Sequence, residues 1–137
     1  MSLTDKILET DLDKRISELK INKNNLDESI LEFAELHYLL SKRYLKLLNS
    51  LNDLEIKLQE RFAERYSYYK VDYDIQLSTQ EIKMFIDNDK ETIEIRKKIK
   101  DIKALLDYTE KNMKNIEQAR WDCKNLIDYM KLKAGII

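Results

Sequence analysis

The chain has 137 residues, of which 37% are charged and 43% are hydrophobic, and its net charge is −1. A chain of this length forms one ordinary domain, and a net charge near zero means that any attraction to nucleic acid must come from local patches. No stretch resembles a secretion signal or approaches the roughly 18 apolar residues of a membrane span, so we expect neither secretion by that route nor a membrane. The single cysteine excludes an internal disulfide, and zero prolines with one glycine predict an all-α fold.

The first 20 residues predict a short amphipathic helix, with Thr4 as its N-cap. The apolar face is thin, so we expect a loosely held N-terminal helical arm (1–20), separate from a helical domain that covers 21–137. Polar residues 21–25 interrupt the pattern, and Asn24 or Asn25 can cap the next helix. The residues expected on the apolar face are Leu8, Leu12, Ile16 and Leu19.

Residues 25–69 predict one long helix, because an apolar seam recurs in alternating steps of four and three, the 3.5-residue period of a coiled coil. At about 1.5 Å per residue this helix would be on the order of 68 Å long, so its seam needs partners from this chain or from other copies. The seam positions are Leu26, Ile30, Phe33, His37, Leu40, Tyr44, Leu47, Leu51, Leu54 and Leu58.

The register of this seam changes near residue 61. The same steps lead next to Arg61 and Arg65, whereas the apolar residues move one place to Phe62 and Tyr66. We therefore expect the apolar stripe to rotate here and the two arginines to turn toward the flank of the helix.

Residues 70–77 lack a helical period and predict a loop. Ser78 and Glu81 form a capping-box pattern that opens a short helix carrying Ile82, Phe85 and Ile86. The polar run 87–89 is expected to end that helix and to cap the next one.

The last helix is predicted over about 90–133, with Thr109 and Arg120 as polar interruptions of a regular seam; such residues fix register or copy number. Apolar residues flank this seam, which favours a higher assembly, and we expect this helix to carry it. The seam is Ile95, Ile99, Ile102, Leu106, Thr109, Met113, Ile116, Arg120, Cys123, Ile127 and Met130, flanked by Leu105, Tyr108, Trp121, Leu126 and Tyr129. The expected contacts between copies are Leu106, Met113, Ile116, Arg120, Trp121, Ile127 and Met130.

No catalytic constellation is readable from the sequence. His37 and Cys123 are the only residues of their types and both lie on apolar seams, which gives no metal cluster and no pair of nucleophile and base. The only glycine is near the C-terminus, so there is no glycine-rich phosphate loop. Carboxylates alternate with lysines, as on solvated helix faces. We predict no catalytic residue, no metal, no cofactor and no enzyme activity.

Residues 61–73 combine cations with tyrosines, the two kinds of group that single-stranded nucleic acid needs: cations follow phosphates, and aromatic faces stack on unpaired bases. The alternative is structural, with the tyrosines packed against the short capped helix and the arginines paired with Glu60 and Glu64. The candidate DNA-binding residues are Arg61, Arg65, Tyr66, Tyr68, Tyr69 and Lys70, with Tyr73 beside them.

A second basic cluster follows at 96–103. Arg96, Lys100 and Lys103 fall at i, i+4 and i+7, which makes one stripe beside the seam, and Lys97 and Lys98 lie near it. Lysine stripes more often serve solubility, so this cluster is the second choice for phosphate binding.

From about residue 22 to the C-terminus, the order and spacing of several residues resemble the UvsY family, the recombination mediators of T4-type bacteriophages. The residues that carry this resemblance are Arg65 with Tyr68 and Tyr69, Ser78, Glu81 with Lys83, Asp89 with Lys90, Leu105 to Tyr108, Ile127, Met130, and Ala134 with Gly135.

The resemblance implies a non-enzymatic protein in the cytoplasm of the infected bacterial host. It implies a homo-oligomeric ring or bundle of about six or more copies that binds single-stranded DNA and helps the phage recombinase displace the single-strand-binding protein. The family's DNA-binding motif has two cations ahead of the tyrosine pair. Arg65 matches the second, Ala63 stands in place of the first, and Arg61 is the substitute that we expect.

Two functions therefore remain open from the sequence: an oligomeric mediator that binds single-stranded DNA, and a coiled-coil adaptor that scaffolds protein partners without binding DNA. An unrecognised enzyme has no residue set to support it. Binding of single-stranded oligonucleotides separates the first two.

Overall fold

The computed structural model describes residues 11–135. Its elements are α2 (Leu26–Ser67), the π-helical turn η1 (Tyr68–Asp72), α3 (Thr79–Asp87) and α4 (Lys90–Lys133), and residues 11–17 are also helical. Residues 11–135 contain no strand, so the predicted all-α class with two long helices joined by a short one is confirmed. Thr4 and Leu8, two predicted positions of the N-terminal helix, lie outside the described residues.

The chain divides into two compact units. Unit 1 is formed by the residues up to Tyr44 together with those from Tyr108 onward, and unit 2 is formed by Leu45–Asp107. Both long helices contribute to both units, and each unit is described by itself below.

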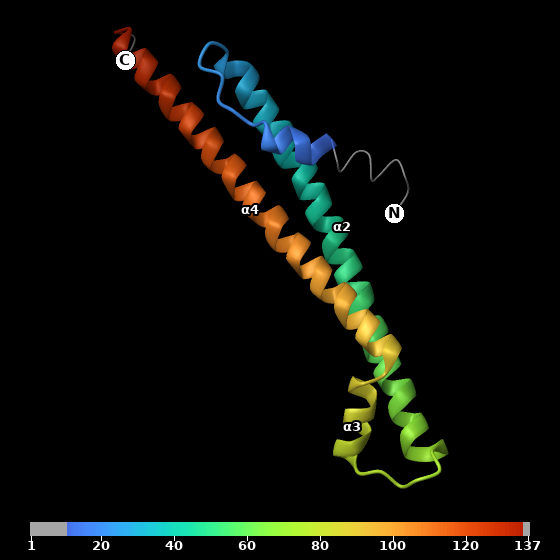
Figure 1. The fold of residues 1–137 in the computed structure, drawn as a ribbon. Coiled ribbons are helices and arrows are strands. Elements are labelled where there is room, and N and C mark those ends of the chain that lie inside the picture. The colour runs from blue at the N-terminus through green and yellow to red at the C-terminus, as the bar shows by residue number, and fades with distance from the viewer. Residues whose placement is uncertain (1–10, 136–137) are drawn as a thin grey trace. The chain divides into compact units, whose positions relative to one another are not determined.

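In unit 1, the first part of α2 and the last part of α4 lie side by side, with helical residues 11–17 against them (Figure 1). The predicted 3.5-residue seam is confirmed here along α2, because its residues from Leu26 to Tyr44 are buried or half-buried, whereas Arg120 and Met130 of the predicted seam on α4 are exposed. The core cluster consists of Leu12, Phe33, Leu36, Leu40, Ile116 and Cys123. A third helical segment thus covers the apolar side of a two-helix pair.

The segment 11–17 is more firmly held than its thin apolar pattern predicts. Leu12 is 7% exposed, and three ion pairs join the segment to α2, two of them from Arg15 to Glu32 and Glu35. Arg15 Nη2 lies 3.0 Å from Glu32 Oε1, and Asp13 Oδ1 lies 2.8 Å from Arg43 Nη1. These contacts come from residues 17 and 30 positions away, which a local pattern does not reveal.

Asn25 caps α2, as predicted. The backbone N–H of Glu28 donates to Asn25 Oδ1 at 3.2 Å, and the Asn25 side-chain amide donates to Glu28 Oε2 at 2.7 Å. One of the otherwise unpaired N–H groups of the first turn is thereby satisfied.

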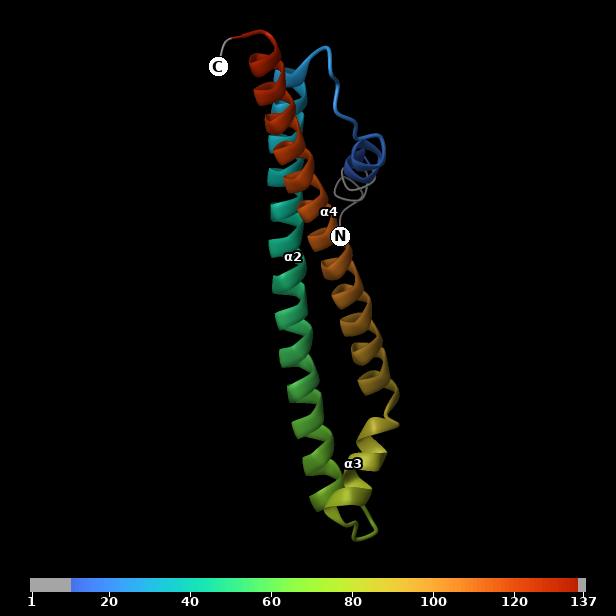
Figure 2. The same ribbon diagram turned by 90° about the vertical axis from the view of Figure 1, so that its left-hand side faces the viewer.

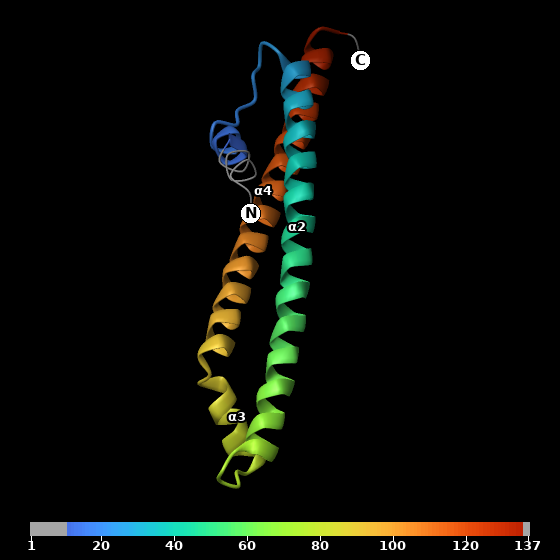
Figure 3. The same cartoon turned by 90° about the vertical axis from the view of Figure 1, so that its right-hand side faces the viewer.

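In unit 2, α3 lies beside the end of α2 and the start of α4 (Figures 2 and 3). Its residues Ile82 and Ile86 are buried, and its predicted capping box is present. The Glu81 N–H donates to Ser78 Oγ and the Ser78 N–H donates to Glu81 Oε1, both at 3.2 Å. Asp89 then opens α4, because its Oδ2 accepts from the Thr92 N–H at 3.1 Å.

Two details of the predicted helices are wrong. Residues 70–72, predicted as a loop, belong to the π-helical turn, which the Tyr73 N–H closes by donating to the Tyr68 carbonyl at 3.0 Å. Arg120, predicted in the seam, is exposed, and Ala119 packs against the core instead. The seam therefore steps by three residues from Ile116 to Ala119 and by four from Ala119 to Cys123. This register keeps the guanidinium of Arg120 out of the apolar seam, where burying an unpaired charge would be costly.

Across residues 11–135, no helix is apolar over a length sufficient to span a membrane.

Candidate nucleic-acid interface

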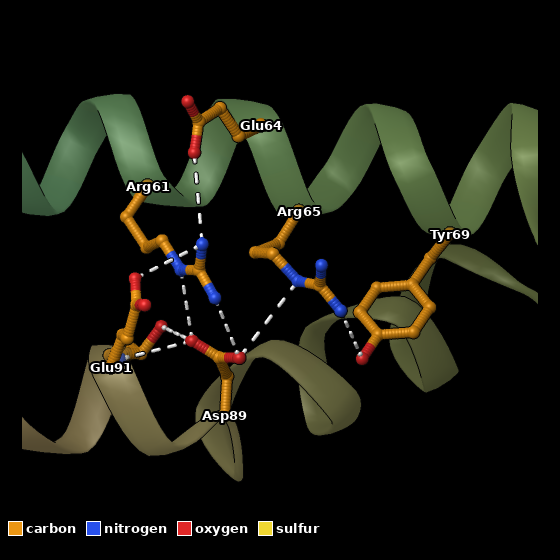
Figure 4. A network of polar contacts seen from close by, with 7 residues as sticks. Arg61, Glu64, Arg65, Tyr69, Asp89 and Glu91 are labelled. Atoms are coloured by element: carbon orange, nitrogen blue, oxygen red, sulfur yellow. Dashed lines mark hydrogen bonds and ion pairs between the residues drawn. The ribbon is translucent and has the colours of Figure 1, made fainter.

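Arg61 is held by carboxylates at the end of unit 2 (Figure 4). Its Nε and Nη2 donate to the two oxygens of Asp89, both at 3.0 Å. Its Nη1 lies 3.1 Å from Glu91 and 3.7 Å from Glu64. This bidentate pair joins the last part of α2 to the first turn of α4, which is the geometry in which arginine and a carboxylate bind most strongly.

The predicted rotation of the apolar stripe is therefore wrong. Arg61 and Arg65 keep the steps of the seam, and their side chains are only 20% and 26% exposed. Two arginines remain at inward positions because Asp89, at the N-cap of α4, places a carboxylate opposite them. That partner lies 28 positions from Arg61 and could not be found from local spacing.

Hydrogen bonds from Arg61 lower the pKa of Asp89 to about 2, against an opposing effect of burial, and the backbone N–H and hydroxyl of Thr92 lower it further. The hydrogen bond that Arg61 donates to Asp89 in turn raises the pKa of Arg61. Both groups stay charged under physiological conditions, so Arg61 is a neutralised cation rather than one available to a phosphate.

Arg65 lies against two neighbouring tyrosine rings. Its guanidinium carbon is 4.6 Å from the centre of the Tyr68 ring and 4.9 Å from that of Tyr69, and its Nη2 donates to the Tyr69 hydroxyl at 3.1 Å. Its Nε is 3.9 Å from Asp89 and is one of the buried polar atoms without a hydrogen bond among the described residues. Tyr68 is 40% exposed, so one ring of this arrangement faces solvent.

Tyr69 and Tyr73 pack against α3, as the structural alternative predicted. Their ring centres lie 5.4 Å and 6.0 Å from that of Phe85. Of the two carboxylates that this alternative paired with the arginines, Glu64 lies 3.7 Å from Arg61, whereas neither Arg61 nor Arg65 pairs with Glu60 among the described residues. Half of the tyrosine cluster thus packs against α3 in unit 2, and Tyr66 and Tyr68 are the two rings that do not contact Phe85.

A groove of about 480 Å³ lies on the outer side of the end of α2. Phe62 and Tyr66 stack in it with ring centres 6.0 Å apart, and Lys70 Nζ lies 5.6 Å from the centre of the Tyr66 ring. The sequence interpretation included Tyr66 and Lys70 but did not assign Phe62 to the site. Its place one residue after a seam position was the available signal.

The second basic cluster lies on exposed positions of α4 in unit 2. Arg96 is paired with Asp87, whose Oδ1 lies 2.9 Å from Arg96 Nη2. Lys97, Lys100 and Lys103 are exposed, and within residues 11–135 none of them has a carboxylate at ion-pair distance. These lysines are uncompensated cations of the second basic cluster.

The residues predicted to join copies are divided between core and surface. Leu106 and Ile116 are buried inside the protomer, and Met113 and Ile127 are half-buried. Trp121 and Met130 are 56% and 41% exposed. In unit 1, a groove of about 410 Å³ is lined by Ile30, Glu117, Arg120, Trp121 and Lys124.

Residues 11–135 contain no group of three or more His, Cys, Asp or Glu side chains that could hold a metal ion. His37 Nε2 lies 3.0 Å from Glu117 Oε1, and this polar contact links α2 to α4 within unit 1.

The two long helices and the short one define an all-α protein, and stacked aromatic rings and lysines lie where these helices connect. A family profile described as "Recombination, repair and ssDNA binding protein UvsY" matches residues 15–136. The chain therefore belongs to the UvsY family.

Solved structures of the bacteriophage T4 recombination mediator protein UvsY share this fold. One crystal form has a TM-score of 0.75 at 18% identity, covering 98% of each chain. Another has a TM-score of 0.74 at 17% identity, covering 97% of this chain and 99% of that one. No protein with curated annotation matches the sequence.

Proposed function

We propose that this protein is a recombination mediator that binds single-stranded DNA as a homo-oligomer. In this role it helps a phage recombinase to displace the single-strand-binding protein in the cytoplasm of the infected host. Membership of the UvsY family supports the recombination and DNA-binding part. The observation that carries the proposal is the aromatic groove of Phe62, Tyr66 and Lys70, because it offers a stacking surface beside a cation.

The proposed contacts have different roles. Tyr66 and Tyr68 present rings to bases, Lys70 presents a charge to a phosphate, and Tyr69 holds Arg65 in place beside Tyr68. Arg61 supports the site from within, because three carboxylates neutralise it. It therefore does not substitute directly for the family cation that is missing at Ala63.

We propose assembly because one protomer carries little net charge. A chain with a net charge of −1 and one small site binds a strand weakly, and several linked sites raise its avidity. For contacts between copies we propose the exposed Arg120, Trp121 and Met130, with half-buried Met113 and Ile127, whereas Leu106 and Ile116 act through the core of the protomer.

A titration of fluorescent oligothymidine at several salt concentrations tests DNA binding. The logarithm of the affinity should fall against the logarithm of salt by about 0.7 per phosphate contact. Tyr66→Leu with Lys70→Gln should weaken binding by about tenfold or more and reduce the slope, since stacking contributes about 1–3 kcal/mol per base.

The chain offers a matched control for this variant. Lys42 lies over Tyr38 at 5.5 Å on α2, with the same spacing of four residues as Lys70 of η1 and Tyr66 of α2. Tyr38→Leu with Lys42→Gln should leave the affinity unchanged. No oligonucleotide binding by the unmodified protein near physiological salt would favour the coiled-coil adaptor.

Mediator activity needs its own measurement. Recombinase loading on DNA covered by single-strand-binding protein should be faster with this protein and slower with the Tyr66→Leu, Lys70→Gln variant. Binding without faster loading would restrict the function to DNA binding.

A further inference from the structure

The two long helices run in opposite directions through unit 2. In such an antiparallel pair, positions that directly precede seam residues on one helix lie beside positions of the same kind on the other helix. Positions that directly follow seam residues meet in the same way on the opposite side. The ion pairs of Arg61 show one of these sides. Glu64 directly precedes the seam residue Arg65. Glu91 directly precedes Thr92, which is buried three residues before Ile95 and so extends the seam of α4 toward its start. Both carboxylates contact Arg61. The flanks that precede the seam residues therefore meet on one side.

The flanks that follow the seam residues meet on the opposite side. On α2 this flank carries Phe62, directly after Arg61, and Tyr66, directly after Arg65. On α4 it carries the basic stripe, directly after Ile95, Ile99 and Ile102. The aromatic groove and the stripe of Arg96, Lys100 and Lys103, which the sequence offered as alternatives, thus lie on the same side of unit 2.

The charge of the two sides differs in sign. The side of Glu64 and Glu91 is acidic, because its carboxylates outnumber Lys46, Lys57 and Lys98. These carboxylates are Asp53, Glu60, Glu64, Glu91, Glu94 and Asp101. On the aromatic side the cations outnumber the carboxylates, since Arg96, Lys100 and Lys103 face only Glu55 and Asp107 on these flanks.

We infer that the aromatic groove and the lysines of α4 form one track for a single strand of nucleic acid. Bases stack on Phe62 and Tyr66, and the backbone then crosses to α4, where Lys100 and Lys103 neutralise phosphates. Arg96 positions the start of this stripe through its ion pair with Asp87 of α3. This inference rests on the proposed DNA binding and adds its path, which excludes the acidic side.

Two variants that remove the same charge from the same helices test this path. Lys100→Gln with Lys103→Gln removes two cations from the aromatic side, and Lys57→Gln with Lys98→Gln removes two from the acidic side. All four lysines are exposed, so both variants should fold as the unmodified protein does, which circular dichroism checks.

In salt-dependent oligothymidine titrations, the first variant should reduce the slope by about 1.4 per protomer, two contacts at about 0.7 each, and weaken binding by about tenfold or more. The second variant should bind like the unmodified protein. Equal losses in both variants, or a larger loss in the second, would overturn the track while leaving DNA binding intact.

Failure of DNA binding itself has a different signature, because the unmodified protein would then not bind the oligonucleotide at all.

Photocross-linking with an oligonucleotide that contains 5-iodouracil adds an independent readout. The cross-linked peptides should contain Phe62 or Tyr66, and cross-links confined to peptides from unit 1 would contradict the track.

Discussion

Asp89 has two structural roles in unit 2. One carboxylate binds Arg61 through two hydrogen bonds and also caps α4 through Thr92. The sequence indicated the cap, since an acidic residue before a helix is a common signal. It did not indicate the ion pair, because Arg61 and Asp89 meet only after the chain has turned back through α3.

Asp89→Asn should lower the free energy of unfolding at neutral pH by roughly 2 kcal/mol, the value of a carboxyl pKa displaced from its ordinary range to about 2. Because the folded pKa is depressed, this contribution is present above about pH 4 and is lost as the pH falls toward 2. Urea unfolding at a fixed protein concentration, repeated between pH 2 and 7, measures both effects.

Glu91→Gln is the control for this substitution. Glu91 contacts the same arginine but its side chain is 65% exposed, so solvent screens the pair and the expected cost is below about 1 kcal/mol. If both variants lost the same stability and kept the same pH dependence, Asp89 would not be the principal partner of Arg61.

The helices show how far local sequence signals reach. The long helices, the Asn25 cap and the capping box of α3 were predicted from period and capping residues, which depend on neighbours within one turn. Two features of the site were not. The inward arginines depend on a distant carboxylate, and the π-helical turn contains Tyr69, whose ring stacks on Phe85 of α3.

Ser78→Ala should destabilise α3 by about 1 kcal/mol, because the N–H of Glu81 loses its acceptor. Hydrogen exchange of the amides in α3 should rise accordingly, and Thr79→Ala, one position into the helix, should change it little. Unchanged protection in the Ser78 variant would show that packing of Ile82 and Ile86 alone holds this helix.

At the scale of the whole molecule, exposed apolar side chains on α4 support the proposed assembly. Trp121, Tyr129 and Leu132 are each more than half exposed. Side chains of this size are rarely left on the surface of a monomer as a group, and they typically mark contacts with other proteins.

Trp121→Glu should therefore reduce the assembled mass in sedimentation experiments while preserving the helical circular dichroism spectrum. Leu31→Glu is the control, because Leu31 is 71% exposed on α2 of the same unit and lies outside the proposed contact. An assembly of unchanged mass in the Trp121 variant would move the contacts between copies to another surface.

The single thiol of the chain, Cys123, can report local opening of unit 1. The side chain is fully buried in the core of unit 1, and burial, with a smaller effect of Asp27, raises its pKa. A thiol in this state reacts with alkylating reagents only when the surrounding helices separate. The labelling rate therefore measures how often unit 1 opens. Comparing the rate with and without oligonucleotide shows whether a strand bound in unit 2 changes the opening of unit 1.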